Sequence, residues 1–157
     1  MFNEPTCVIM VGLPGCGKST YRKKYLSDLL VSSTDDYIES YAAEMGLTYN
    51  DVFKEVVGIA TTQMNKLIAD CIKGNRSFVV DQTNLSVKKR KSLLDKVPSH
   101  YRKIAIVFNT PWHTEWQKRL DSRPGKVIPM EILSSMLDNF VYPTYNEAFD
   151  EIWSVRN

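Results

Sequence analysis

The sequence predicts an α/β fold, a three-layer sandwich in which a parallel sheet of about five strands carries helices on both faces. Two observations lead to this prediction. Short apolar runs of strand length recur along the chain, and segments with helical spacing of apolar residues lie between them. Uninterrupted apolar runs are typical of strands buried on both faces, as they are in a parallel sheet. Strands that alternate with helices therefore favour this sandwich.

The predicted strands are Thr6–Val11, Leu30–Ser33, Ser77–Asp81, Lys103–Phe108 and Glu151–Val155. Helical spacing of apolar residues covers Ser19–Leu30 and Asn50–Lys73. A further helix is expected to begin at Pro129, because proline is well tolerated in a first helical turn. Its apolar face would carry Ile132, Leu133, Met136, Leu137 and Phe140.

The composition fits one domain over residues 1–157. The 157 residues are 43% hydrophobic and 24% charged, which excludes a disordered chain, a collagen-like repeat and a disulfide-dense mini-protein. The formal net charge of +2 does not by itself indicate nucleic-acid binding. Three scattered cysteines suit a reducing compartment. The first residues, MFNEPT, lack a basic signal region, and no apolar run approaches the roughly 18 residues of a membrane span. We therefore expect a cytoplasmic protein without a membrane segment.

A phosphate-binding motif follows the first predicted strand. The segment GLPGCGKS matches the pattern G-x-x-x-x-G-K-[ST] at every specified position. Its glycines let backbone N–H groups point at phosphate oxygens, at the start of a helix. A chance match is the alternative, and the apolar strand before the motif and the helix after it argue against chance. The expected nucleotide-binding residues are Gly12, Gly15, Cys16, Gly17, Lys18, Ser19 and Thr20.

Carboxylates at two other strand ends are candidates for chemistry. Asp35 and Asp36 follow the second predicted strand, at the edge where open α/β sheets bind ligands. We expect Asp35 to take the proton of an acceptor hydroxyl, with Tyr37 beside the acceptor. The alternative role, a cap for a helix that begins near Tyr37, is the one expected for Asp36. Asp81 ends the third predicted strand, as an acid that holds Mg²⁺ or its waters would, although aspartate also often begins a turn.

Polar and basic residues beyond these strands complete the predicted site. Thr83 and Asn84 would face the acceptor, and Arg90 in the cationic run Lys88–Lys91 would contact a phosphate backbone, unless this run is only a solvated helix face. Thr114 and Gln117 have the spacing of a capping box. The helix that they would open carries Arg119 and Arg123, followed by a Pro-Gly break. We expect a mobile lid over the triphosphate around residues 114–127, with an exposed connector as the alternative.

The ordered set GLPGCGKST, TDDY, DQTN, R-x-x-x-R and VIP resembles the P-loop kinase module of polynucleotide 5′-hydroxyl kinases, including the bacteriophage enzymes. The resemblance implies ATP and Mg²⁺ as cofactors, bound through Lys18 and Ser19. It also implies Asp35 as general base and Arg119 and Arg123 as lid arginines. One position departs from the family, since the phage enzyme has an arginine after D-D-Y that binds the acceptor's phosphate, and Ile38 stands here.

The implied activity is transfer of the γ-phosphate of ATP to a hydroxyl of a nucleic acid, with DNA expected rather than RNA. Similar small phage kinases phosphorylate 5-hydroxymethyluracil within DNA, so the acceptor is either that base or a 5′-OH end. A kinase for a small molecule or nucleoside is an alternative. A non-catalytic ATP-binding module is another, because VDQTN is also similar to the kinase-like domain of heterogeneous nuclear ribonucleoprotein U.

Overall fold

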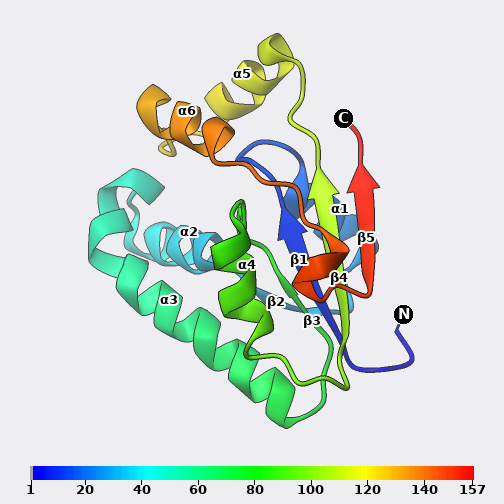
Figure 1. The fold of residues 1–157 in the computed structure, drawn as a ribbon. Helices are drawn as coiled ribbons and strands as arrows, with labels where there is room; N and C mark the ends of the chain where they lie inside the picture. Colours follow the sequence, from blue (N-terminus) through cyan, green and yellow to red (C-terminus); the bar gives the residue numbers. More distant parts are fainter. Residues whose placement is uncertain (1) are drawn as a thin grey trace.

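Five parallel strands form one sheet in the computed structural model, which describes residues 2–157 (Figure 1). The strand order is β2-β3-β1-β4-β5, and every neighbouring pair is parallel. The strands are β1 (Thr6–Val11), β2 (Leu30–Ser32), β3 (Phe78–Val80), β4 (Arg102–Phe108) and β5 (Glu151–Val155). The predicted α/β sandwich is confirmed. The bounds of β1 and β5 agree with the prediction, and the other strands differ by one residue at one or both ends.

Helices cover both faces of the sheet. Alternate residues of a strand point to opposite faces, so Val8 and Met10 pack with Leu26 after α1 (Lys18–Tyr25). Cys7 and Ile9 pack on the other face, with residues of α3 (Tyr49–Lys73) and α4 (Val87–Leu94). The predicted strand–helix alternation therefore produces the expected three layers.

Two further groups of helices flank the sheet. Helix α2 (Thr34–Met45) packs against α3 around a small core of its own, made of Ile38, Ala42, Val52, Val56 and Ala60. Helices α5 (His113–Asp121) and α6 (Met130–Asp138) lie beyond the carboxyl ends of the strands, at the top of Figure 1. A short 3-10 turn, Tyr145–Glu147, precedes β5. The carboxyl ends of the strands thus face α2 at one side and α5 and α6 above.

The starts of α2 and α5 differ from the prediction by more than one residue, and α1 ends at Tyr25 instead of Leu30. Helix α2 begins at Thr34 instead of near Tyr37, because the Ser33 hydroxyl accepts the N–H of Asp36 and caps the helix. The predicted capping box at Thr114 and Gln117 is wrong, since α5 begins at His113 without a side-chain cap. Capping boxes occur instead where threonine precedes α3 and the 3-10 turn.

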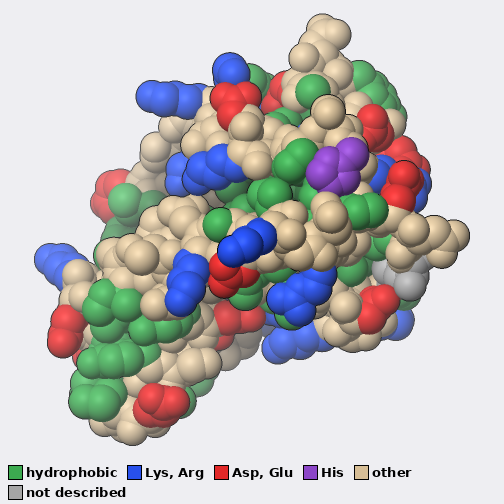
Figure 2. Space-filling model, turned by 90° about the horizontal axis from the view of Figure 1, so that it is seen from below, with side chains coloured by type: hydrophobic (Ala, Val, Ile, Leu, Met, Phe, Trp, Pro, Cys, Tyr) green, Lys and Arg blue, Asp and Glu red, His purple; other side chains and the backbone are tan. Residues whose placement is uncertain are grey.

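The face opposite α5 and α6 carries charged side chains of both signs. Figure 2 shows lysine and arginine side chains interspersed there with acidic and apolar ones. Within residues 2–157, no helix is both long and apolar enough to cross a lipid bilayer.

Candidate active site

The phosphate-binding motif forms the loop between β1 and α1. Gly17 adopts a left-handed conformation, with φ of 94°, immediately before the first helical residue, Lys18. The Lys18 side chain is buried and its Nζ donates to the carbonyl oxygens of Gly12 (2.8 Å) and Leu13 (3.0 Å). Cys16 is buried, so this residue can offer a ligand only its backbone. Ser19 and Thr20 are exposed at the start of the helix.

Three segments from elsewhere in the chain hold this loop. The N–H of Gly12 donates to the carbonyl of Thr83 (3.0 Å). Trp116 Nε1 of α5 donates to the carbonyl of Pro14 (2.7 Å), and Asn157 Nδ2 donates to the carbonyl of Cys16 (3.1 Å). Sequence reasoning assigned no such role to Trp116 or Asn157, because these bonds span more than a hundred residues and no local pattern marks them.

The candidate metal residues are adjacent. The Ser19 hydroxyl donates to Asp81 Oδ2 at 3.0 Å, so a hydroxyl and a carboxylate lie together beside the loop. Both are oxygen ligands of the kind that Mg²⁺ takes. In the described part of the chain, no cluster of three or more His, Cys, Asp or Glu side chains could hold a metal alone. Mg²⁺ takes few protein ligands and keeps waters and phosphate oxygens in its shell, so a hydroxyl and one carboxylate fit it.

Asp35 lies at the centre of a second cluster. Its Oδ1 accepts the hydroxyl of Tyr49 at 2.7 Å, and its Oδ2 lies 2.9 Å from Lys126 Nζ. Lys126 also contacts Glu39 at 2.9 Å and lies over the Tyr49 ring. Burial by itself would raise the pKa of Asp35, but Lys126 and the Tyr49 hydroxyl outweigh it and lower that pKa. Lys18 of the phosphate loop also lowers the pKa of Asp35.

The two arginines that were predicted to belong to a lid lie beside these groups. Arg119 contacts Glu115 (2.9 Å) and the Asn157 side chain (2.9 Å), and its Nη1 is 3.5 Å from the carbonyl of Gly15. Arg123 Nε is buried and has no hydrogen-bond partner within residues 2–157. A buried guanidinium nitrogen without a protein partner fits an anionic ligand such as a triphosphate. Arg123 also opposes the rise in the pKa of Tyr49 that burial and Asp35 cause, so it acts electrostatically on the Asp35 cluster.

Other predicted acceptor residues lie elsewhere or act differently. The predicted phosphate contact of Arg90 is wrong, because its side chain is fully buried and is bonded to Glu147 (2.8 Å) and the carbonyl of Asn84. Asn84 is buried as well, and donates to the carbonyl of Met10 (2.8 Å), so it supports the sheet instead of facing an acceptor. Thr83 lies next to the loop through its carbonyl.

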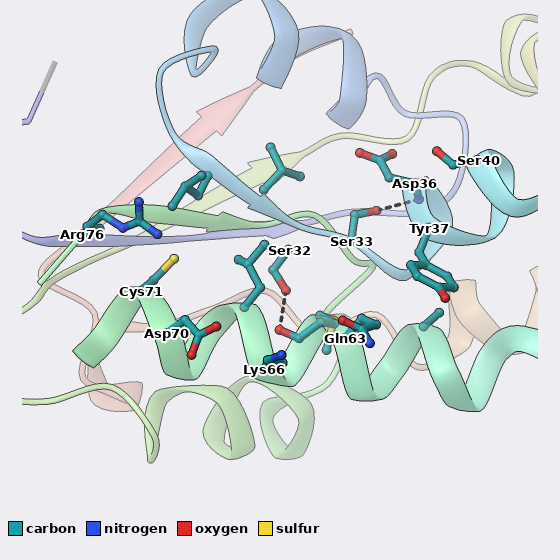
Figure 3. A pocket seen from close by; sticks show the side chains of 15 residues that line it. Ser32, Ser33, Asp36, Tyr37, Ser40, Gln63, Lys66, Asp70, Cys71 and Arg76 are labelled. Carbon is teal, nitrogen blue, oxygen red and sulfur yellow. Dashed lines mark hydrogen bonds between the residues drawn. The ribbon is translucent and has the colours of Figure 1, made fainter. Parts of the chain in front are cut away.

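Ile38 stands where the resembling phage enzyme has an acceptor-binding arginine, but it does not face an acceptor here. Its side chain is fully buried in the α2–α3 core. Nor does Asp36 cap α2, since its carboxylate binds Arg22. Tyr37 is half-buried against the same core and lines a groove of about 580 Å³ between β2, α2 and α3 (Figure 3). In Figure 3 this groove extends from Tyr37 and Asp36 along α3 to Arg76.

Known proteins match most of this chain in sequence. Heterogeneous nuclear ribonucleoprotein U-like protein 2 of Mus musculus is 30% identical over 167 residues, which cover 95% of this chain and 21% of the relative. L-seryl-tRNA(Sec) kinase of Methanococcus maripaludis is 24% identical, over 91% of this chain and 55% of the relative. The chain thus spans about a fifth of the first relative and about half of the second.

Solved structures share the fold. A putative kinase from Chloroflexus aurantiacus superposes with a TM-score of 0.70 and 17% identity, over 98% of this chain and 89% of the other. A chain of the Pnkp1/Rnl/Hen1 RNA repair complex superposes with a TM-score of 0.65 and 21% identity, over 96% of this chain and 48% of the other. These likenesses show the α/β fold of P-loop kinases. Residues 7–143 match the family described as AAA domain, and since they make up most of the chain, the protein belongs to that family.

Proposed function

We propose that this protein is an ATP-dependent kinase that transfers the γ-phosphate to a hydroxyl group of a nucleic acid. The observation that carries the proposal is the position of Asp35, which follows β2 at the same edge of the parallel sheet as the phosphate loop after β1. Tyr49 (2.7 Å) and Lys126 (2.9 Å) hold its carboxylate there. A base in that place can accept the proton of a hydroxyl while the phosphoryl group is transferred.

The other residues have roles that follow from their positions. Lys18 and the loop N–H groups would bind the β- and γ-phosphates, and Arg119 and Arg123 would cover the negative charge from α5 and the turn after it. Ser19 and Asp81 would hold Mg²⁺, which neutralises phosphate charge when bound. We propose that the segment around residues 114–127 acts as the lid that excludes water from this site.

The nature of the acceptor rests on the resemblance and on the relatives' names. A 5′-OH end or a 5-hydroxymethyluracil base of DNA is the acceptor that the resemblance implies. The names of two relatives, a seryl-tRNA(Sec) kinase and an RNA repair complex, concern RNA, so an RNA acceptor belongs in the test. Lys126, which contacts Asp35, supplies the acceptor side with a cation that the sequence pattern did not assign to it.

A small-molecule kinase is the second candidate. The solved structures with this fold include a sugar kinase, with a TM-score of 0.62 and 17% identity over 97% of this chain. Salt dependence separates the two candidates, because contacts with several nucleic-acid phosphates release counterions and weaken as salt increases.

The test is transfer of labelled γ-phosphate from ATP to three acceptors in parallel. These are a 5′-OH DNA oligonucleotide, its RNA counterpart, and a 5′-phosphorylated duplex that contains 5-hydroxymethyluracil. Lys18→Ala protein, purified in the same way, controls for a contaminating kinase. Label on any acceptor with wild type and none with Lys18→Ala supports the proposal and identifies the acceptor. Label on none of the three contradicts it and favours the small-molecule kinase or a binding module.

A further inference from the structure

Arg22 of α1 is a buried arginine that contacts two carboxylates from two other elements. Its Nε lies 2.9 Å from Asp81 Oδ2, at the end of β3, and its Nη2 lies 3.0 Å from Asp36 Oδ2, in the first turn of α2. The arginine side chain is 8% exposed. One guanidinium therefore joins the metal side of the site to the helix that carries Asp35.

The contact with Asp81 fixes how this carboxylate is oriented. Oδ2 receives both the Ser19 hydroxyl (3.0 Å) and Arg22 Nε (2.9 Å). Two donors on one oxygen hold the carboxylate plane and leave Oδ1 as the oxygen available to a hydrated cation. Arg22 thus orients the metal-side carboxylate without occupying both of its oxygens.

The contact with Asp36 fixes the start of α2. The N–H of Asp36 donates to the Ser33 hydroxyl, and its carboxylate is held by Arg22, so the first helical turn is fixed at two points. Asp35 is the neighbouring residue in the same turn. Burial raises the pKa of Asp36, Arg22 opposes that rise and Asp81 adds to it. Arg22 therefore lies between two carboxylates that repel each other.

An arginine is suited to this position for a geometric reason. Its planar guanidinium places two nitrogens at fixed directions, one toward each carboxylate, whereas a lysine ammonium is a single point charge on a flexible chain. The two carboxylates offset the cost of burying the cation, and its removal would leave both of them unpaired.

We propose that Arg22 is a positioning residue that couples the Mg²⁺ side of the site to the acceptor side. The inference rests on the proposed function, because it assigns Asp81 to Mg²⁺ and Asp35 to the acceptor. Arg22 orients Asp81 on one side and holds the helical turn of Asp35 on the other, and it contacts neither substrate. Disturbing Arg22 therefore affects both sides, while disturbing Asp36 affects the acceptor side alone.

The experiment compares Arg22→Gln, Arg22→Lys, Asp36→Ala and the double variant Arg22→Gln/Asp36→Ala with wild type. Lys24→Gln is the matched control, because this lysine lies on the surface of the same helix, over the Tyr25 ring. Binding of a fluorescent ATP analogue is titrated with and without Mg²⁺, thermal unfolding reports the folded state, and kcat is measured with the acceptor found above.

Arg22→Gln is expected to weaken the apparent Mg²⁺ affinity and lower kcat, each by about 10- to 100-fold, as loss of an orienting partner of a metal ligand does. Affinity for the analogue without Mg²⁺ should change by less than about twofold, which a general disruption of the loop would not allow. Asp36→Ala should lower kcat and keep Mg²⁺ affinity within about twofold. The kcat of the double variant should be no lower than that of Arg22→Gln, because both changes remove the same contact between Arg22 and Asp36.

The inference would be overturned if folded Arg22→Gln kept the Mg²⁺ affinity of wild type. It would also be overturned if the loss of kcat in the double variant equalled the product of the losses in the two single variants. If Arg22→Gln does not fold, two other variants test the inference. Arg22→Lys must weaken Mg²⁺ affinity, and Asp36→Ala must leave it unchanged. A wild-type protein that binds Mg²⁺ and the analogue but phosphorylates no acceptor contradicts the proposed function alone. The Mg²⁺ titration still tests the Asp81 half of the inference in that case.

Discussion

Lys126 Nζ lies 2.9 Å from Asp35 Oδ2, although the two residues are 91 positions apart. The turn after α5 thus brings an ammonium group against the candidate base. Asn50 fixes this turn, since its N–H donates to the carbonyl of Gly125 (2.9 Å) and its side chain bonds both the N–H and the carbonyl of Val127 (3.1 Å each). The base is therefore held by α3 through Tyr49 and by the segment after α5 through Lys126.

Lys126→Gln should shift the acid limb of the pH–rate profile to higher pH. In the proposed function Asp35 is the general base, which acts only when ionised. Lys126 is one of the groups that keep the pKa of Asp35 below the usual value. Without the ammonium, Asp35 becomes protonated at a higher pH as the solution is acidified, so activity is lost earlier. The measurement is kcat/KM against pH, with the exposed Lys118→Gln as control. An acid limb that shifts to lower pH, or one that Lys118→Gln shifts equally, would contradict this role.

Asp35→Asn should lower kcat by about 10²- to 10⁴-fold, which is the usual contribution of a general base. The affinity for ATP should stay within about twofold, because the proposed function places Asp35 on the acceptor side. Glu39→Gln is the matched control, since Glu39 binds the same Lys126 at the surface and an exposed ion pair contributes little. Steady-state kinetics and nucleotide titration distinguish the outcomes. A loss of ATP affinity without a loss of kcat would place Asp35 on the nucleotide side.

Gly125→Ala should release the turn after α5 from α3. Gly125 has φ of 69°, and a Cβ there would lie 2.6 Å from Thr48 Cγ2. Gly46 has nearly the same φ, 68°, but nothing lies within 4 Å of its added Cβ. Both substitutions have a backbone cost of about 1–2 kcal/mol, so Gly46→Ala controls for it. Hydrogen exchange of the Asn50 amide, which donates to the carbonyl of Gly125, should accelerate only in Gly125→Ala. Equal exchange in the two variants would show that Thr48 does not constrain the turn.

Arg90→Ala should destabilise the fold strongly. The guanidinium is fully buried with Glu147, and removing one partner of a buried ion pair costs about 3–5 kcal/mol. The neighbouring exposed Lys89→Ala should change the free energy of unfolding by less than about 0.5 kcal/mol. Chemical denaturation measures both variants. If Arg90→Ala instead kept its stability and lost affinity for an oligonucleotide, the original prediction of a phosphate contact would be restored.

The features predictable from the sequence are those with a local signal. The bounds of β1 follow from its uninterrupted apolar run, and the phosphate loop follows from the spacing of its glycines and Lys18. The burial of Arg90 was also predictable from helical spacing, although this residue was placed in a solvent-facing cationic run. Arg90 lies four residues before Leu94, so helical spacing places both on the buried face of α4. Ile38 and Ala42 have the same spacing on the buried face of α2.

The contacts that organise the site have no such signal. Arg22 reaches Asp81 across 59 positions and Tyr49 reaches Asp35 across 14, and each contact depends on how helices pack on the sheet. Sequence spacing can place Asp35 at the end of β2, but it cannot show which hydroxyl or ammonium will contact the carboxylate. The contacts of Asp35 with Tyr49 and Lys126, and those of Arg22 with its two carboxylates, therefore could not be predicted from the sequence.

The separate core of α2 and α3 has an evolutionary consequence. These helices bury Ile38, Val52 and Val56 among themselves, whereas the phosphate loop is supported by β1, Trp116 and Asn157. Substitutions in the helical pair can therefore change the Asp35 side of the site while the phosphate-binding loop keeps its form. Arg22, which contacts Asp36 of α2 and Asp81 at the end of β3, is a point at which the two parts must stay compatible.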